Sequence, residues 1–195
     1  MEKAGVGRRC WSVSLAGAVA AVALAAGLAT AAFAEGQASL VEIEARVERD
    51  YPRVTSMLPQ HVDQLLRQRR DVLVLDVREA DEFAVSHIPG AVQVDPGLTA
   101  SQFQAQFGPA LAGRTVIVYC SVGVRSSKLA ERVGNVTRAA GATGVYNLKG
   151  GIFAWHNFGL GLAQGQNRTE FVHPYSRSWS RYLDFPNYSR YGARD

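Results

Sequence analysis

One of the two cysteines in the chain, Cys120, has neighbours that could make it a nucleophile. From Cys120 the sequence reads Cys-Ser-Val-Gly-Val-Arg-Ser, and Gly123 permits a tight bend. A loop of this kind can turn successive backbone N–H groups inward, and a helix that follows it presents the positive end of its dipole. With the fixed charge of Arg125, the loop predicts a cradle that stabilises a thiolate or a negatively charged sulfur bound to it. The alternative is a small buried hydrophobe, the usual fate of a free cysteine.

Asp76 and Arg78 are further ionisable residues at a predicted strand end. Short, mostly β-branched apolar runs precede both Asp76 (residues 72–75) and Cys120 (residues 115–119), and such runs are typical of strands in a parallel sheet. Since ligands bind at the carboxyl edge of such sheets, we expect Asp76 and Cys120 to share one edge. A strand-end aspartate often caps a helix or pairs with a nearby arginine. For Asp76 and Arg78 we therefore favour structural support over direct catalysis.

Segments typical of strands and of helices alternate along the middle of the chain. Apolar periodicity and turn signals predict helices over residues 39–50, 59–70, 79–84 and 126–140, and strands over residues 72–75, 91–94, 115–119 and 145–148. Ser126 or Ser127 is suited to cap the last of these helices. The alternation predicts an α/β domain with a mainly parallel central sheet flanked by helices.

The first 34 residues have the pattern of a cleavable signal peptide. Lys3, Arg8 and Arg9 precede an uncharged, alanine-rich run over residues 10–34 that ends at a small-x-small site. An uncleaved anchor is the alternative, because the run is long enough to cross a bilayer. Cleavage would remove the other cysteine, so Cys120 would be the only thiol of the mature chain and could form no internal disulfide.

The remaining chain divides into a helical extension over residues 35–53, one domain over residues 54–163, and a C-terminal extension over residues 164–195. The signal holds three of the 21 Lys and Arg residues and one of the 17 Asp and Glu residues, so 18 basic and 16 acidic residues would remain. This near balance argues against a polyanionic partner.

The C-terminal extension interleaves aromatic residues with arginines. Tyr175, Trp179 and Tyr182 are spaced i, i+4 and i+7, which predicts a short amphipathic helix folded back on the domain. A docking surface for a protein partner is the alternative.

Four motifs, in this order and spacing, resemble those of single-domain rhodaneses. They are the strand end Asp76-Val77-Arg78-Glu79, the loop His87-Ile88-Pro89-Gly90-Ala91, the active-site loop Cys120-x-x-Gly123-x-Arg125-Ser126, and Val145-Tyr146-Asn147-Leu148-Lys149-Gly150-Gly151 followed by Trp155 and Gly159. The resemblance covers about residues 54–163. The chain departs from the pattern at Ser86, where many relatives have glycine, and in the longer connection over residues 134–143.

The resemblance implies a sulfurtransferase that carries sulfane sulfur as a persulfide on Cys120. A donor such as thiosulfate would supply the sulfur, and cyanide, a thiol or a thiol protein would accept it. The implied substrate-binding loop consists of Ser121, Val122, Gly123, Val124, Arg125 and Ser126.

No cofactor is implied for this chemistry, and the four scattered histidines indicate no metal site. An exported protein rarely meets nucleic acid, so none is expected as a partner. The signal predicts export, to the periplasm if the host is a Gram-negative bacterium, with no stable membrane insertion after cleavage.

Two other functions remain open. Cell-cycle dual-specificity phosphatases share the fold and use a cysteine and an arginine in one loop, but they place five residues between the two. Only four residues stand between Cys120 and Arg125, which favours sulfur over phosphate as the cargo. The second possibility is a non-catalytic binding module with the aromatic extension as its interface. Inactive relatives usually lack the cysteine, whereas this chain keeps Cys120.

Overall fold

The computed structural model describes residues 39–69 and 71–193, which belong to one unit of the chain, residues 38–195. The expected signal peptide, residues 1–34, lies outside the described residues, and so does Cys10. Among the helices that are described, none has the length and apolar character needed to cross a membrane.

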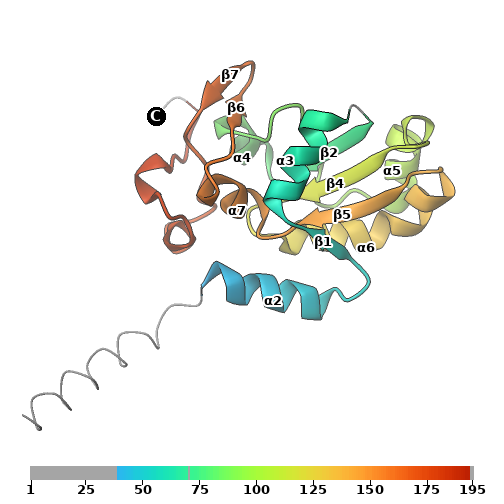
Figure 1. Ribbon diagram of the computed structural model, residues 1–195, viewed down its shortest axis with the longest axis horizontal. Coiled ribbons are helices and arrows are strands. Elements are labelled where there is room, and N and C mark those ends of the chain that lie inside the picture. The colour runs from blue at the N-terminus through green and yellow to red at the C-terminus, as the bar shows by residue number, and fades with distance from the viewer. Residues whose placement is uncertain (1–38, 70, 194–195) are drawn as a thin grey trace, which may run out of the picture. The chain divides into compact units, whose positions relative to one another are not determined.

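Five strands form a central sheet in which every neighbouring pair is parallel (Figure 1). They are β1 (Thr55–Met57), β2 (Val72–Asp76), β3 (Val92–Gln93), β4 (Thr115–Tyr119) and β5 (Gly144–Leu148). The order across the sheet is β1-β5-β4-β2-β3, so β4 is central, and all five of its residues are buried. The predicted α/β class with a mainly parallel sheet is confirmed.

Helices cover both faces of this sheet. They are α2 (Leu40–Asp50), α3 (Pro59–Gln68), α4 (Ala80–Val85), α5 (Ala100–Phe107), α6 (Val124–Ala139) and α7 (Gly151–Asn157). Val116 and Val118 of β4 pack in one core with α5 and α6, whereas Ile117, between them, packs in a second core with α3 and α7. Both faces of β4 are buried in this way because successive side chains of a strand point to opposite sides.

The four predicted helices correspond to α2, α3, α4 and α6, with ends shifted by one or two residues. The sequence patterns do not reveal α7, because six of its seven residues are buried and it has no polar face to set a period. They also miss α5, in which Phe103 and Phe107 are the only buried residues.

The C-terminal extension begins with an antiparallel hairpin of β6 (Leu162–Gln164) and β7 (Asn167–Thr169) and then folds back on the domain. The predicted helix over Tyr175 to Tyr182 is wrong: only a 3-10 turn, Ser180–Tyr182, forms there. Two other 3-10 turns are Gly108–Ala110 and Pro186–Tyr188.

Tyr175 itself opposes a helix, because its backbone is left-handed with φ of +64°. Serine side chains also compete with helical backbone bonding: Ser176 pairs with Ser178 at 3.0 Å, and Ser180 donates to the Arg177 carbonyl at 2.8 Å. The segment nevertheless packs on the domain, since Tyr182 is buried.

Candidate active site

Cys120 lies at the carboxyl edge of the central sheet. It directly follows β4, and Tyr119, the last residue of β4, pairs in register with Asp76, the last residue of β2. The structure therefore brings Asp76 and Cys120 to the same edge, as the strand pattern predicts. Cys120 is buried and is the only free cysteine among the residues that the structure describes.

The Cys120 sulfur is surrounded by donors from its own loop. The Gly123 N–H donates to Sγ at 3.2 Å, and the Ser126 hydroxyl lies 3.5 Å from Sγ. Gly123 has φ of +102°, a left-handed backbone that glycine adopts without a steric penalty. The first hydrogen bond inside α6 runs from Ser127 N to Gly123 O, so the preceding N–H groups of the first turn have no acceptor inside the helix.

The prediction that Ser126 or Ser127 caps this helix is wrong. Gly123 is the N-cap and α6 begins at Val124, so both serines are buried inside the first two turns. Ser126 Oγ donates instead to Asn147 Oδ1 of β5 at 2.7 Å. Part of the predicted loop is therefore the first helical turn, which directs the positive end of the α6 dipole toward the cysteine loop.

The backbone of the cysteine loop is held from behind by α7. Ile152 N donates to Cys120 O at 2.9 Å, and Phe153 N donates to Ser121 O at 3.1 Å. Gly151 makes this approach possible, because a Cβ atom there would lie 2.6 Å from Ser121 O. With these carbonyls bound to α7, the loop presents N–H groups and not carbonyl oxygens to the sulfur.

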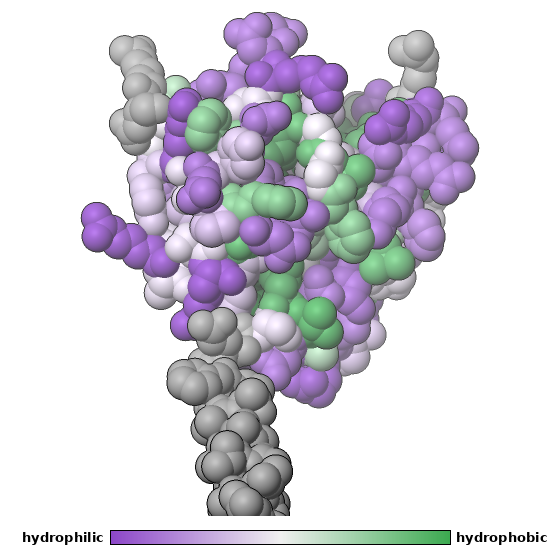
Figure 2. All heavy atoms as spheres, turned by 60° about the vertical axis from the view of Figure 1, so that its left-hand side comes forward, coloured by the Kyte–Doolittle hydropathy of each residue, from purple (hydrophilic) through white to green (hydrophobic). Residues whose placement is uncertain are grey.

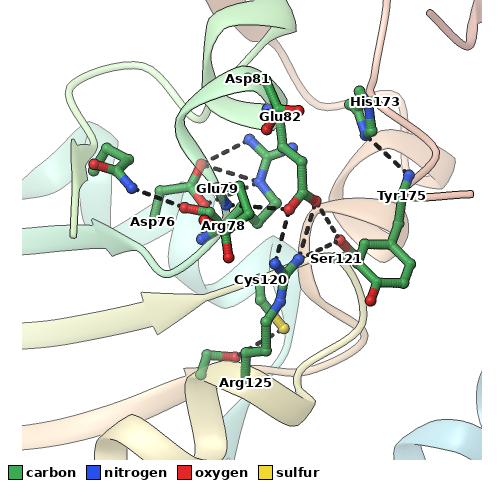
Figure 3. A network of polar contacts seen from close by, with 12 residues as sticks. Asp76, Arg78, Glu79, Asp81, Glu82, Cys120, Ser121, Arg125, His173 and Tyr175 are labelled. Atoms are coloured by element: carbon green, nitrogen blue, oxygen red, sulfur yellow. Dashed lines mark hydrogen bonds and ion pairs between the residues drawn. The ribbon is translucent and has the colours of Figure 1, made fainter. Parts of the chain in front are cut away.

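Arg125 is held by a carboxylate that sequence reasoning missed (Figure 3). Its guanidinium donates to both oxygens of Glu82, at 2.8 and 3.0 Å, and to Ser121 Oγ at 3.1 Å. Ser121 Oγ in turn donates to Glu82 Oε1 at 3.0 Å. Burial raises the pKa of Glu82, but the hydrogen bonds and charge of Arg125 outweigh this effect and hold the pKa below its ordinary value.

The two valines of the loop differ in exposure. Val122 is buried in the core, whereas Val124 is 41% exposed. Both line the pocket that opens onto Cys120.

Asp76 and Arg78 form a fully buried ion pair next to this site. Arg78 Nε and Nη2 donate to the Asp76 carboxylate at 2.9 and 2.7 Å, and Nη2 also donates to Ser86 O at 2.5 Å. Burial alone lowers the pKa of Arg78, but the carboxylate of Asp76 more than reverses this. The Tyr119 hydroxyl accepts the N–H of Ile88 at 3.1 Å. The pair and Tyr119 thus fix the chain around residues 86–88 against the sheet.

Sequence reasoning did not assign a role at the site to three residues: Glu82, Tyr175 and Asn147. Glu82 is an acidic residue in the first turn of a helix, which usually indicates a solvated face or dipole compensation. Tyr175 lies 50 residues beyond Arg125 and places its ring 5.1 Å from that guanidinium. Asn147 alone has a faint signal, because an amide is unusual in a short apolar strand.

A pocket of about 670 Å³ opens onto the site. Cys120, Ser121 and Arg125 line it together with residues of α2 and of the C-terminal extension. Within the described part of the chain, no cluster of three or more His, Cys, Asp or Glu residues is placed to hold a metal ion.

Comparison with known proteins finds relatives of the central part of the chain. The family described as "Rhodanese-like domain" matches residues 58–158. An uncharacterized protein of Synechocystis is 34% identical over 104 residues, which are 53% of this chain and 54% of that protein. This chain therefore spans about half the length of that relative.

Two shorter relatives have named activities. A sulfurtransferase of Allochromatium vinosum is 32% identical over 101 residues, which are 52% of this chain and 87% of that protein. The thiosulfate sulfurtransferase GlpE of Coxiella burnetii is 30% identical over 90 residues, which are 46% of this chain and 77% of that protein.

The matched segment, residues 58–158, is just over half of the chain and contains β2 to β5, the Cys120 loop and α7. The motifs that begin at Asp76 and at Cys120 lie together at the carboxyl edge of β2 and β4. The chain belongs to the rhodanese-like domain family.

Proposed function

We propose that this protein is a sulfurtransferase that moves sulfane sulfur from a donor such as thiosulfate to a thiol or cyanide, through a persulfide on Cys120. The strongest support for this proposal is the set of backbone hydrogen-bond donors around the Cys120 sulfur. The Gly123 N–H contacts Sγ at 3.2 Å, and the N-terminus of α6 lies beside it. Fixed backbone donors stabilise negative charge on sulfur without reorganising in each step.

The first step loads the enzyme. The Cys120 thiolate attacks the outer sulfur of thiosulfate, and a bond forms between this sulfur and Sγ. The original sulfur–sulfur bond of thiosulfate breaks, and sulfite leaves with the bonding electrons. The product is a persulfide whose terminal sulfur carries negative charge near the amides of the first turn of α6.

The second step unloads the enzyme. An acceptor thiolate, or cyanide, attacks the terminal sulfur, and the bond to Sγ breaks. The electron pair returns to Sγ, which restores the Cys120 thiolate. Since Cys120 is the only cysteine among the described residues and Cys10 lies in the expected signal, the acceptor must come from outside the mature chain.

Phosphate transfer is the enzymatic alternative, and two features argue against it. Four residues separate Cys120 from Arg125, which leaves a small loop around the sulfur. The Arg125 guanidinium is also turned toward Glu82, which would repel a phosphate dianion. Cys120-dependent turnover of a phosphomonoester would overturn the proposal.

Export belongs to this proposal, with residues 1–34 as the cleaved signal and the periplasm as the destination in a Gram-negative host. The N-terminal sequence of the secreted protein tests it: a mature chain that begins at Glu35 supports cleavage, and one that keeps residues 10–34 supports an anchor.

A transfer assay tests the activity itself. Purified protein given thiosulfate and cyanide should produce thiocyanate, and Cys120→Ser should lose this activity by at least about a thousandfold, because it removes the only cysteine among the described residues. In protein purified with residues 1–34 retained, Cys10→Ser is the matched control, since the proposal gives that thiol no role. Equal loss in both variants would contradict it.

A further inference from the structure

The pocket that opens onto Cys120 is much larger than an inorganic sulfur donor. Its volume of about 670 Å³ lies in the range of roughly 300–1,000 Å³ that organic ligands of moderate size fill. Thiosulfate or cyanide would occupy a small part of it. Cys120 and Arg125 line the pocket together with apolar and aromatic side chains, and α2 adds four charged residues, Glu42, Arg46, Arg49 and Asp50.

One wall of the pocket is α2. Ile43 and Val47 lie one helical turn apart on the same face of α2 and line the pocket. The helix packs on the domain through Leu40 and Ile43, which contact the hydrophobic core, and a 2.8 Å ion pair between Glu48 and Lys149 adds to this packing.

Another wall is built from aromatic residues of the C-terminal extension. Ring centroids are 4.9 Å apart for Tyr175 and Trp179 and 5.9 Å apart for Trp179 and Tyr182. Asn157 Nδ2 donates to Tyr182 O at 2.9 Å, and the Tyr175 N–H donates to His173 Nδ1 at 3.0 Å. The bond to His173 holds Tyr175 in a left-handed backbone conformation, which residues other than glycine rarely adopt.

Hydrophobic residues form a band across the face that carries this extension, with hydrophilic residues on both sides (Figure 2). Apolar surface with a polar rim marks a binding surface more often than chance. Both α2 and the aromatic residues 175–182 lie outside residues 58–158, the segment shared with the family. These two walls of the pocket thus lie outside the segment that matches the family.

We infer that this pocket binds the sulfur acceptor, and that the acceptor is a small organic thiol with an aromatic or branched apolar body. The inference rests on the proposed function, because it requires the persulfide on Cys120. The body of the acceptor lies between Ile43 and Trp179, and its thiolate reaches the terminal sulfur at Cys120. A sulfur–sulfur bond forms to the acceptor, the bond to Sγ breaks, the electron pair returns to Sγ, and the thiol proton goes to solvent.

The choice between two thiols of similar basicity tests this directly. Phenylmethanethiol and 2-mercaptoethanol are both alkanethiols. A difference in their KM values therefore reflects binding of the organic group and not the reactivity of the thiol. With thiosulfate as donor, we expect the KM for phenylmethanethiol to be at least about tenfold lower, since a buried phenyl ring contributes that much or more to binding. Equal KM values for the two thiols would overturn the inference.

Variants of the pocket residues test whether the preference for phenylmethanethiol arises in this pocket. In Trp179→Ala, the ratio of kcat/KM for phenylmethanethiol to that for cyanide should fall about tenfold. Phe158→Ala is the matched control, because it removes an aromatic ring that is 54% exposed and lies outside the pocket. The ratio should be unchanged in this control. A ratio that Trp179→Ala does not change would count against the inference.

If Trp179→Ala fails to fold, a second variant and a binding measurement still test the inference. Tyr175 is 48% exposed, and asparagine tolerates its left-handed backbone, so Tyr175→Asn should fold and lower the same ratio about threefold. Benzyl methyl sulfide, which cannot accept sulfur, should bind the unloaded wild-type protein in calorimetry and bind Tyr175→Asn more weakly.

The two proposals can fail separately. If no persulfide forms but benzyl methyl sulfide binds, the sulfurtransferase proposal fails and the pocket still selects apolar organic bodies. If the persulfide forms but neither thiol preference nor sulfide binding depends on Tyr175 and Trp179, the inference about the acceptor fails alone.

Discussion

The positive charge of Arg125 is largely compensated where it stands. Both oxygens of Glu82 accept from its guanidinium, and the Glu82 side chain is almost fully buried. The nearest donor to the Cys120 sulfur is the backbone N–H of Gly123, at 3.2 Å. Burial lowers the pKa of Arg125, but its bonds to Glu82 and its interaction with the Cys120 sulfur outweigh this and raise the pKa above its ordinary value. Together with Glu82, Arg125 also holds the shape of the loop through Ser121.

Removing the charge of Glu82 should therefore destabilise the protein. In Glu82→Gln, Arg125 loses its ionic partner, and we expect the free energy of unfolding to fall by about 2 kcal/mol. This lies below the usual cost of breaking a fully buried pair because the Arg125 side chain is 25% exposed. Urea titration measures the change.

Asp81→Asn is the matched control for this prediction. It removes the same charge from the neighbouring residue of α4, but Asp81 is exposed, and asparagine can still accept the N–H of Glu82. Its stability should stay within about 0.5 kcal/mol of the wild type. Equal losses in the two variants would show that the pair with Arg125 is not the cause.

The residues of the cysteine loop could be predicted from sequence because the loop is local. Cys120, Gly123 and Arg125 lie within six positions, and their types already specify a turn, a nucleophile and a charge. Glu82 is 43 positions away from Arg125, so only the fold shows that the two meet. Contacts of this kind depend on which strands are neighbours, which local patterns do not determine.

At the scale of elements, α7 supports the cysteine loop through the close approach of Gly151. Its φ is +58°, and a Cβ atom there would lie against Cys120 O and 2.6 Å from Ser121 O. Backbone atoms cannot move aside without shifting the loop. The start of α7 and the cysteine loop therefore form one packed unit.

Gly151→Ala should disturb this unit. We expect a loss of about 2 kcal/mol or more in the free energy of unfolding, and a lower rate of sulfur transfer, because the new methyl group displaces the loop backbone. Gly165→Ala provides the control: Gly165 has the same φ of +58° but no atom within 4 Å of the added Cβ. It should pay only the backbone cost of about 1 kcal/mol and keep its activity.

If Gly151→Ala and Gly165→Ala lose equal stability and keep equal activity, the close contact between α7 and the cysteine loop does not determine stability or activity. Chemical denaturation and the thiocyanate assay measure both quantities on the same preparations.

The elements that could be predicted are those with a clear burial pattern. The runs at residues 72–75 and 115–119 form β2 and β4 because strands buried on both faces need continuous apolar residues. The aromatic spacing after Tyr175 suggested a helix, yet it reflects side chains that pack on each other along an irregular chain. Spacing alone does not distinguish these two cases.

At the scale of the whole molecule, two buried histidines bind the backbone of the C-terminal extension, His156 from the domain and His173 from within the extension itself. His156 Nε2 lies 3.0 Å from Glu170 O, and His173 Nδ1 accepts the N–H of Tyr175 at 3.0 Å. Burial holds the pKa of both imidazoles below their ordinary value of about 6.5. Both histidines are therefore neutral in the folded protein at neutral pH.

The protein should lose stability as the pH falls below about 6.5. In that range the unfolded chain takes up protons on these histidines and the folded protein does not, so acidification favours unfolding by up to about 1.4 kcal/mol per pH unit for each histidine. The carboxylate of Glu82, whose pKa is lowered, contributes stability that is lost only below about 4.5. Urea titrations between about pH 7.5 and 3.5 cover both windows and separate them.

A histidine variant tests whether His173 causes part of this loss of stability at low pH. His173→Asn should reduce the slope of stability against pH between about 6.5 and 5. A slope that is the same in the wild type and in His173→Asn would contradict the account of this residue.

The persulfide on Cys120 is the central claim, and mass spectrometry of the Cys120 peptide after treatment with thiosulfate tests it most directly. The account predicts that this peptide gains the mass of one sulfur atom, that cyanide removes the added mass, and that Cys120→Ser shows no gain. A wild-type peptide that keeps its mass after thiosulfate, from protein whose free thiol still reacts with an alkylating reagent, would contradict the account.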